Sequence, residues 1–343
     1  MAENLVEEYI QAREHEFIYN QNLRTFIITW NVASNFNVDE LTLTLVKSIQ
    51  EMPDIIVIGL QEVQMSVAGV NMVRSVLEAQ VYSSIPKDHE YFLLHSQHLG
   101  GISLFLFAKI SFKIQVIDVT SGIIALGPLA TANKGAVCIS LLLRKSSLCI
   151  VCSHLPAHQE FLSARNEAFN TILNKMILNH DRSGSLKIMD HDYVYWLGDL
   201  NYRIEFTEFP SSLLDYSMKE LESLYELDQL NISRKNAQAF QGFYETTISF
   251  KPTYKLLKSE GIMEYDKARL PAWCDRILYR SKVPEHLEPI EYKSVEIPIS
   301  SDHYPVIGKF KLNVPLYDEN AYENLLSKAN IIQPKISVSP QSL

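Results

Sequence analysis

The chain has 343 residues, of which 47% are hydrophobic and 21% are charged, and its formal net charge is −9 at pH 7. This composition is ordinary for a globular protein, and the length fits one large domain or two small ones. The acidic balance excludes a general nucleic-acid-binding surface but leaves room for a local basic pocket. The charged N-terminus lacks the apolar segment of a signal peptide, and the longest apolar runs are too short to span a bilayer.

Apolar, β-branched and aromatic runs predict the strands, and 3.6-residue patterns predict the helices. Helices are expected at residues 3–17, 39–50 (with Asp39 as N-cap), 71–80, 160–178, 207–237 and 318–330. Strands are expected at residues 23–31, 54–60, 91–95, 102–108, 113–119, 136–143, 148–153, 193–197, 276–280, 295–297 and 306–312. Residues 181–185 are expected to form a surface turn, and residues 242–275 have little regular pattern.

The order of these elements favours a single main domain. We expect an N-terminal helix over residues 1–19, one domain over 20–314, and a C-terminal helix with a disordered tail over 315–343, the disorder starting at Gln333. Strands outnumber helices, and short turns join several neighbouring strands. This favours an α/β fold of packed mixed sheets flanked by helices over a doubly wound parallel sheet.

The cysteines indicate the redox environment. Each lies in or beside an apolar stretch: Cys138, Cys149, Cys152 and Cys274. No second pair completes a zinc site, so we expect buried free thiols, which suit a reducing, cytoplasmic compartment.

The stretch Asp192–Arg203, DYVYWLGDLNYR, combines a buried strand with polar chemistry. Its apolar run ends at Gly198, and Asp199 and Asn201 follow two residues apart. If the extended backbone continues, both side chains point to the same side. A lone G-D-x-N is more often an Asx-rich turn, so the functional interpretation depends on other strands ending in the same way.

Polar side chains also follow four other apolar strand candidates: Asn31, Glu62, His154, and the pair Asp302-His303. Carboxylate and carboxamide oxygens are hard ligands that suit Mg²⁺, and the histidines suit donation to a phosphoryl group. Together they indicate metal-assisted attack of water on a phosphate ester. Taken alone, Glu62 is equally well a surface carboxylate and His154 a structural histidine. His158 is assigned a structural role, because Pro156 argues against one helical face shared with His154.

A local basic segment lies in this otherwise acidic chain. Its basic residues are Lys251, Lys255, Lys258, Lys267, Arg269, Arg276 and Arg280. Tyr254-Lys255 and Lys267-x-Arg269 suit the binding of additional phosphates by charge-assisted hydrogen bonds. The alternative is a solvated loop with ordinary surface lysines.

Two long motifs, WLGDLNYR at 196–203 and PAWCDRIL at 271–278, resemble the signatures of the inositol polyphosphate 5-phosphatases. Shorter matches follow in the same order: TWN at 29–31, GLQEV at 59–63, NKGAV at 133–137, SHLPAH at 153–158, PTYK at 252–255 and SDHYPV at 301–306. The resemblance covers about residues 20–312, and it implies that the domain expected over 20–314 is the catalytic domain. The N-terminal REHEFIYNQNLRTF is most similar to the type II subgroup, which contains the Lowe-syndrome protein.

The resemblance implies a DNase I-like four-layer α/β sandwich of two packed mixed sheets, shared with apurinic endonucleases. It implies that Glu62 and Asn31 bind Mg²⁺ and that Asp302 lies near the metal. For the reaction, it implies that Asp199 orients or deprotonates the attacking water and that Asn201 and His303 stabilise the transition state. It further implies that His154 contacts the scissile phosphate or assists the leaving group, and that Asp275 orients His303.

The resemblance also implies substrate-binding residues, several of them for a neighbouring 4-phosphate: Arg165, Tyr254, Lys255, Lys267, Arg269, Arg276 and Lys134. The segment Leu99–Phe107 lies where the family has a membrane-facing loop, although its own sequence predicts a core strand.

The chain departs from the family pattern at several places without losing an implied metal ligand. Ala33-Ser34 replaces Asn-Gly, Ala136 replaces the second Gly of NKGG, RNEAF at 165–169 replaces RNQDY, and Tyr304 replaces a common Lys. These changes affect the expected loop shape, the expected 4-phosphate contact near Arg165, and the charge near His303.

The resulting hypothesis is a Mg²⁺-dependent phosphatase that removes the 5-phosphate from PtdIns(4,5)P2, PtdIns(3,4,5)P3 and soluble inositol polyphosphates. We expect a cytoplasmic monomer that meets cytosolic membrane surfaces transiently and binds no nucleic acid. Two alternatives stay open: a phosphodiesterase of the same superfamily, nuclease or sphingomyelinase, and a non-catalytic phosphoinositide-binding module.

Overall fold

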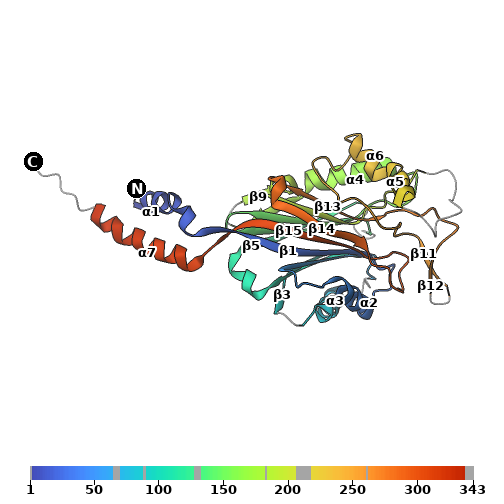
Figure 1. The fold of residues 1–343 in the computed structure, drawn as a ribbon, viewed down its shortest axis with the longest axis horizontal. Coiled ribbons are helices and arrows are strands. Elements are labelled where there is room, and N and C mark those ends of the chain that lie inside the picture. The colour runs from blue at the N-terminus through green and yellow to red at the C-terminus, as the bar shows by residue number, and fades with distance from the viewer. Residues whose placement is uncertain are drawn as a thin grey trace, which may run out of the picture.

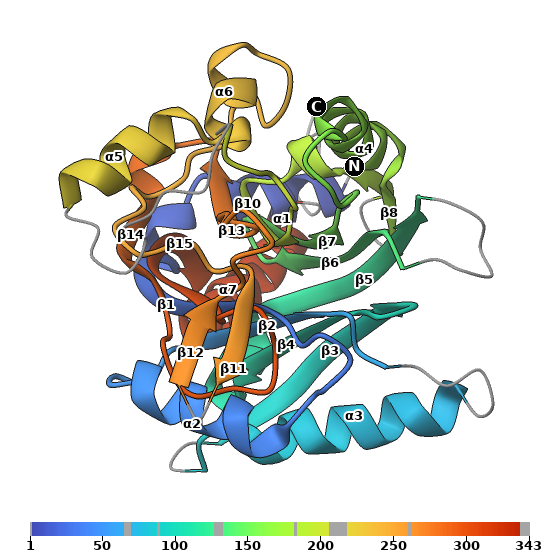
Figure 2. The ribbon, with the colours of Figure 1, turned by 90° about the vertical axis from the view of Figure 1, so that its right-hand side faces the viewer.

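The computed structural model describes residues 2–64, 70–87, 90–126, 133–181, 184–205, 218–259 and 262–336. Two β-sheets pack face to face, and helices cover their outer faces (Figures 1 and 2). This confirms the predicted DNase I-like four-layer α/β sandwich. No helix among the described residues is both long and apolar enough to cross a membrane.

The first sheet has six strands in the order β14-β15-β1-β2-β4-β3. Their bounds are β1 Ile18–Asn31, β2 Ile55–Gln61, β3 Tyr91–Leu99, β4 Ile102–Lys109, β14 Leu287–Ser294 and β15 Val306–Tyr317. β1 runs parallel to β2, and the other neighbours are antiparallel. Every residue of β2 is buried, because this β-branched strand lies in the middle of the sheet with both faces covered.

The second sheet has five strands in the order β13-β10-β7-β6-β5. Their bounds are β5 Val116–Ala125, β6 Gly135–Leu143, β7 Ser147–His154, β10 Tyr193–Asp199 and β13 Asp275–Ser281. β7 and β10 are parallel, and the other pairs are antiparallel. Gly198 lies so close to the neighbouring strand that an added Cβ would collide with the carbonyl oxygen of Ser153. Only glycine lets the end of β10 lie there.

Three apolar clusters hold the layers together. The largest fills the space between the sheets, with Ile27, Val57, Ile150 and Leu197 fully buried in it. A second lies under α2 (Val38–Ser48) and α3 (Val70–Ser84), on the outer face of the first sheet. A third lies under α4 (Leu162–Lys175) and α6 (Gln229–Lys235), on the other outer face. α5 (Met218–Glu226) precedes α6.

The two terminal helices form an arm at one end of the molecule. α1 (Ala2–Gln11) lies beside α7 (Glu319–Ile336), and Figure 1 shows both projecting to the left of the sandwich. Two small hairpins, β8 (Ile177–His180) with β9 (Gly184–Lys187) and β11 (Leu256–Ser259) with β12 (Ile262–Tyr265), complete the strands. The 3₁₀ helices are η1 Glu14–Glu16, η2 Ile110–Gln115, η4 Ile188–Asp190 and η5 Pro284–His286.

Some predicted elements were wrong in extent or place. The N-cap of α2 is Asn37, whose side chain accepts from the backbone of Asp39. The helix predicted over 160–178 ends at Lys175, and β8 follows it. The last short strand is β14 at 287–294 instead of 295–297, and the region 242–275 contains the β11–β12 hairpin.

The C-terminal helix is also longer than predicted. It continues to Ile336, so residues 333–336 are helical where disorder was expected. Residues 337–343 of the predicted tail lie outside the described residues, as do 182–183 of the predicted turn and 207–217 of the predicted acidic helix. The four cysteines are buried free thiols, as predicted.

Candidate active site

The polar strand ends meet at the end of the sandwich opposite the α1–α7 arm. In the parallel pairs, Asn31 of β1 lies beside Gln61 of β2, and His154 of β7 lies beside Asp199 of β10. Parallel strands end at the same edge of a sheet, and the two sheets pack face to face. The structure therefore brings together side chains that are far apart in the sequence, as the strand-end pattern predicted. Figure 2 looks at this end of the molecule.

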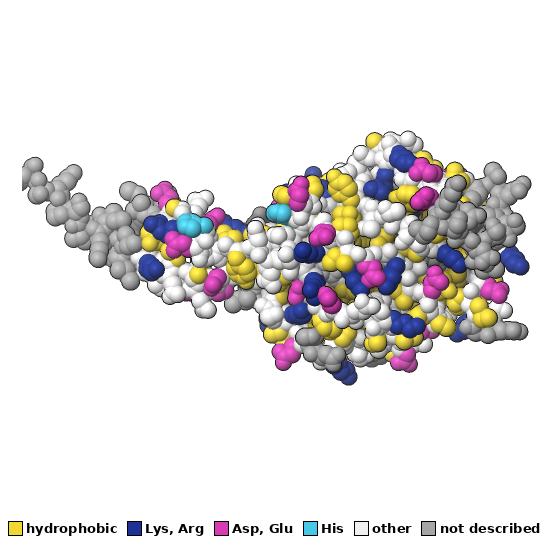
Figure 3. Space-filling view, viewed as in Figure 1, with side chains coloured by type: hydrophobic (Ala, Val, Ile, Leu, Met, Phe, Trp, Pro, Cys, Tyr) yellow, Lys and Arg dark blue, Asp and Glu magenta, His cyan; other side chains and the backbone are white. Residues whose placement is uncertain are grey.

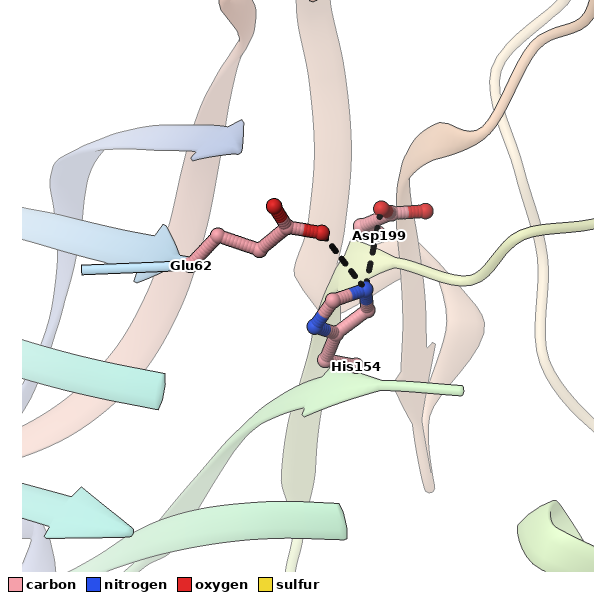
Figure 4. Close-up of side chains that lie close together, drawn as sticks. All are labelled: Glu62, His154 and Asp199. Carbon is pink, nitrogen blue, oxygen red and sulfur yellow. Dashed lines mark ion pairs between the residues drawn. The ribbon is translucent and has the colours of Figure 1, made fainter. Parts of the chain in front are cut away.

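Three of these side chains form a compact cluster, which Figure 4 shows: Glu62, His154 and Asp199. The Nε2 atom of His154 lies 3.2 Å from Oδ2 of Asp199 and 3.7 Å from Oε1 of Glu62. The Lys134 ammonium group also contacts His154 Nε2. Burial lowers the pKa of Lys134, although the carboxylates of Asp199 and Glu62 oppose this effect. The cluster thus joins two carboxylates to two nitrogen groups that suit a phosphoryl oxygen.

The Asp199 carboxylate is the most strongly held anion of the site. Its side chain is almost completely buried, and Asn31 Nδ2 donates to Oδ2 at 2.9 Å. Burial alone raises the pKa of Asp199, but His154 and His303 outweigh it and hold the pKa well below its ordinary range. Asp199 is therefore ionised throughout the range in which proteins work.

A second group joins Asp199 to Asp275 and His303. His303 Nδ1 lies 2.8 Å from Asp275 Oδ2, which also accepts from Thr253 Oγ1 at 2.7 Å. Burial lowers the pKa of His303, but the Asp275 carboxylate outweighs it and raises that pKa to about 9. At neutral pH His303 is consequently an imidazolium. Its Nε2–H is a second donor, and this atom lies 3.9 Å from Asp302 Oδ1.

Asn201 does not continue the strand, so the extended-backbone expectation was wrong. β10 ends at Asp199, and Asn201 has a left-handed φ of 56°. Its backbone N–H donates to Asp199 Oδ1 at 3.0 Å, and its side chain donates to the Leu155 carbonyl at 3.2 Å. The carboxamide oxygen accepts from Arg203 at 2.5 Å. Asn201 is thus fixed at the edge of the cluster by an Asx turn and by Arg203.

Arg203 was missed by the sequence interpretation, although it closes the motif WLGDLNYR. Its guanidinium lies 4.7 Å from the ring centre of Tyr254, which suits a cation–π contact. Both side chains line a cavity of about 240 Å³ together with Arg269 and His158. Its position in the motif, two residues after Asn201, was the sequence signal that could have identified Arg203 as a site residue.

The predicted substrate-binding residues divide into two groups. Tyr254 and Arg269 line the cavity, and the Tyr254 ring also lies 4.6 Å from the His303 ring. Lys255 lies nearby, with Nζ 3.8 Å from Asp302 and 3.9 Å from Asp266. Lys267 is exposed on the loop that follows.

Two arginines do not face the cavity, and their predicted contact with substrate was wrong. Arg165 is fully buried and donates to the carbonyl oxygens of Pro156, His158 and Gln159. Burial lowers the pKa of Arg165 to about 10. This side chain supports the loop 156–159 from beneath. His158, to which a structural role was assigned, instead has an exposed side chain on the cavity.

Arg276 is the second such arginine. Its guanidinium bridges Asp228 and Glu245, and none of the three side chains has exposed surface. Motif membership cannot distinguish a buried ion pair of this kind from a residue that faces substrate.

The donor set fits a hard divalent cation. Glu62 holds a partly exposed carboxylate over the buried Asp199, and oxygen ligands of this kind suit Mg²⁺ or Ca²⁺. The carboxamide oxygen of Asn31 accepts from the Ala33 N–H at 2.9 Å and keeps a second lone pair. Asp302 adds another carboxylate within the same end of the sandwich.

The departures from the family pattern do not displace the residues of the acidic cluster. Ala33 and Ser34 both adopt positive φ, 47° and 64°, which glycine or asparagine adopts more easily. The Ser34 N–H still donates to the Glu62 carbonyl at 2.9 Å. Ala136 is a buried residue of β6, and Tyr304 is half-buried against the cluster under α2.

The chain belongs to the endonuclease/exonuclease/phosphatase family, whose family 2 model matches residues 28–309. Its curated relatives are inositol 5-phosphatases, as the motifs predicted. It is 31% identical to the type II inositol 1,4,5-trisphosphate 5-phosphatase of Mus musculus, over 96% of this chain and 33% of the relative. It is 33% identical to the phosphatidylinositol 4,5-bisphosphate 5-phosphatase INP51 of Saccharomyces cerevisiae, over 92% of this chain and 34% of the relative.

A solved structure supports the same assignment. The inositol polyphosphate 5-phosphatase domain of SPsynaptojanin, in complex with inositol (1,4)-bisphosphate and calcium ion, is 30% identical. It superimposes with a TM-score of 0.76 over 98% of each chain. The present chain spans about a third of the length of the two curated relatives.

Proposed function

We propose that this chain is a Mg²⁺-dependent phosphomonoesterase that removes the 5-phosphate of PtdIns(4,5)P2, PtdIns(3,4,5)P3 and soluble inositol polyphosphates. The observation that carries the proposal is the contact between the two parts of the site. Tyr254 lies against His303 of the acidic cluster and also lines the basic cavity with Arg203 and Arg269. A substrate with two neighbouring phosphates fits this arrangement, because one phosphate enters each part.

Glu62 and Asn31, with Asp302 nearby, would hold the Mg²⁺. When bound, the cation neutralises phosphoryl charge and acidifies water. Asp199 orients the attacking water by accepting its hydrogen bond. Its pKa lies well below the ordinary range, so we favour this orienting role over storage of the water's proton.

The charge that develops on the phosphoryl oxygens is met by donors of the chain. His303 donates from Nε2 while Asp275 fixes Nδ1. Asn201 offers its remaining amide hydrogen from a position that Arg203 fixes. Lys134 contacts His154, which lies against Asp199, and both suit contact with the scissile phosphate.

The neighbouring phosphate would bind at the cavity beside Tyr254. Arg203 and Arg269 supply positive charge there, and Lys255 and Lys267 lie on the adjacent segment. In a chain of net charge −9, this local basic lining favours a compact polyanion over nucleic acid. We further propose a cytoplasmic monomer that meets cytosolic membranes transiently.

The test is Mg²⁺-dependent phosphate release from PtdIns(4,5)P2, PtdIns(3,4,5)P3, Ins(1,4,5)P3 and Ins(1,4)P2. We expect release only from the three compounds with a 5-phosphate and its loss in EDTA. Asp199→Ala should lower turnover on the order of 10³-fold while circular dichroism shows a folded protein. Near-normal turnover of this variant would remove Asp199 from its role. Release from abasic DNA or sphingomyelin alone would indicate a phosphodiesterase, and lipid binding without release would indicate a binding module.

A further inference from the structure

The hairpin formed by β11 and β12 has two unlike faces. Leu256 pairs with Tyr265, Leu257 with Glu264, Lys258 with Met263 and Ser259 with Ile262. Alternate residues of a strand point to opposite faces, so Leu257 and Ile262 share one face, called here the outer face. Leu256 and Met263 share the other.

The inner face is packed against the protein. Leu256 is 2% exposed, and Met263 contacts the apolar cluster under α2. The Tyr265 hydroxyl donates to the Pro252 carbonyl at 2.6 Å. These contacts hold the hairpin in one orientation, so its outer face has a fixed direction.

The outer face presents aliphatic side chains to solvent. Leu257 is 48% exposed and Ile262 is 64% exposed. The two lie diagonally across the hairpin, because Leu257 is opposite Glu264 and Ile262 is opposite Ser259. Two large aliphatic residues on one face of a hairpin are costly to leave in water. Their area is far below the roughly 800 Å² per partner that a stable protein interface requires. It does suit shallow insertion into a lipid surface.

The hairpin lies next to the candidate active site. The Leu256 N–H donates to the Asp302 carbonyl at 2.9 Å, and the Tyr304 N–H donates to the Thr253 carbonyl at 3.0 Å. These bonds join the base of the hairpin to the loop that carries His303. Figures 1 and 2 show β11 and β12 at the site end of the molecule, far from the α1–α7 arm.

Basic side chains flank the outer face. Lys267 and Arg269 are exposed on the loop that follows the hairpin, and the exposed Lys258 lies at the hairpin's edge, on the face of its partner Met263. Glu264 is the acidic residue of the outer face. Figure 3 shows basic, acidic and hydrophobic side chains interspersed at this end of the molecule. Lysine and arginine beside an apolar tip favour an anionic lipid surface, because the cations contact headgroups while the aliphatic groups enter the acyl boundary.

We propose that the outer face of the β11–β12 hairpin docks on the anionic membrane that carries the substrate, inserting Leu257 and Ile262 beside the active site. This inference rests on the proposed 5-phosphatase function and assigns the lipid surface to a particular element. It implies that lipid turnover depends on the hairpin, while turnover of a soluble headgroup does not.

The experiment compares Leu257→Gln/Ile262→Gln with a matched control, Val283→Gln. Val283 is 44% exposed just beyond Ser281, whereas β13 begins at the site with Asp275. The first readout is sedimentation with phosphatidylcholine–phosphatidylserine vesicles that contain no substrate. The second is phosphate release from PtdIns(4,5)P2 in such vesicles and from Ins(1,4,5)P3 in solution.

We expect the double variant to lose about tenfold or more in vesicle binding and in turnover of vesicle PtdIns(4,5)P2, with unchanged kcat/KM for Ins(1,4,5)P3. The control should match the unmodified chain in every assay. Unchanged vesicle binding, or equal losses on the lipid and soluble substrates, would overturn the proposal. If the unmodified chain released no phosphate, the proposed function would fail, and substrate-free sedimentation would still decide whether the hairpin docks.

Discussion

Replacing Arg276 by alanine should destabilise the fold rather than weaken substrate binding. The guanidinium donates to both carboxylate oxygens of Asp228 at 3.0 Å, and to the two oxygens of Glu245 at 2.7 Å each. Neither carboxylate has exposed surface, and burial raises the pKa of Asp228. Arg276→Ala leaves two buried carboxylates facing an empty space, and Arg234, 3.6 Å from Glu245, remains as a cation beside one of them.

Removing one partner of a buried ion pair costs about 3–5 kcal/mol, and here two carboxylates lose their shared partner. We therefore expect a loss of about 5 kcal/mol in the free energy of unfolding, out of the roughly 5–15 kcal/mol of a typical domain. Arg276→Lys keeps the charge but not the planar fork, so we expect a smaller loss of about 2 kcal/mol.

Urea unfolding followed by circular dichroism measures these losses, and phosphate release is normalised to the folded fraction. The control is Lys282→Ala, because Lys282 pairs with Asp192 at 3.0 Å on the surface and its loss should cost less than about 1 kcal/mol. An unchanged unfolding midpoint in Arg276→Ala, together with a raised KM, would refute the structural role and restore the predicted substrate contact.

Three further predictions concern the acidic cluster. Asp275→Asn removes the carboxylate that raises the pKa of His303 to about 9, whereas the burial that lowers this pKa remains. The pKa of His303 should therefore fall. The alkaline limb of the kcat profile, expected near pH 9 where His303 loses its proton, should shift to lower pH, and an unshifted limb would exclude His303 as the titrating group. The same His303–Asp275 pair stabilises the fold fully below about pH 6.5 and loses that contribution as pH rises through about 9. Glu62→Gln should raise the Mg²⁺ concentration needed for half-maximal turnover at least tenfold, and equal Mg²⁺ titrations of the two proteins would contradict its role as ligand.

The core of the fold was predictable because its strands are continuous apolar runs. Ile55–Gln61 and Tyr193–Asp199 are buried along their whole length, and their sequences indicate strands without reference to neighbours. The edges were less predictable. The strand Leu287–Ser294 mixes buried and exposed positions and contains Pro289, so pairing with β15 decides its place. The helix predicted to 178 ends at Lys175. Leu178 is buried in the β8–β9 hairpin, which the local sequence pattern does not predict.

The site was predictable to the extent that it depends on strand order. Asn31, His154 and Asp199 each end a strand, so the two parallel pairs, one in each sheet, place them at one end of the sandwich. The local sequence does not show whether an arginine of a helix or strand faces the cavity or the interior of the protein. Arginine is a common phosphate ligand, but Arg165 and Arg276 are buried. Arg165 binds backbone carbonyl groups and Arg276 binds carboxylates, so both stabilise the fold around the site. Tertiary contacts decide such roles, and a single sequence does not contain them.

An unusual backbone conformation recurs in the turns that carry the site residues. Among the described residues, non-glycine positions with positive φ include Ala33, Ser34, Glu62, His158 and Asn201, and all five follow a strand that ends at the site. Residues of this kind are uncommon and cost energy, and they concentrate where function requires a side chain at a sharp turn. Glycine would relieve the strain at Glu62 and Asn201 but would remove the carboxylate and the carboxamide. The strained turns are therefore the physical condition for aiming these two groups into one space.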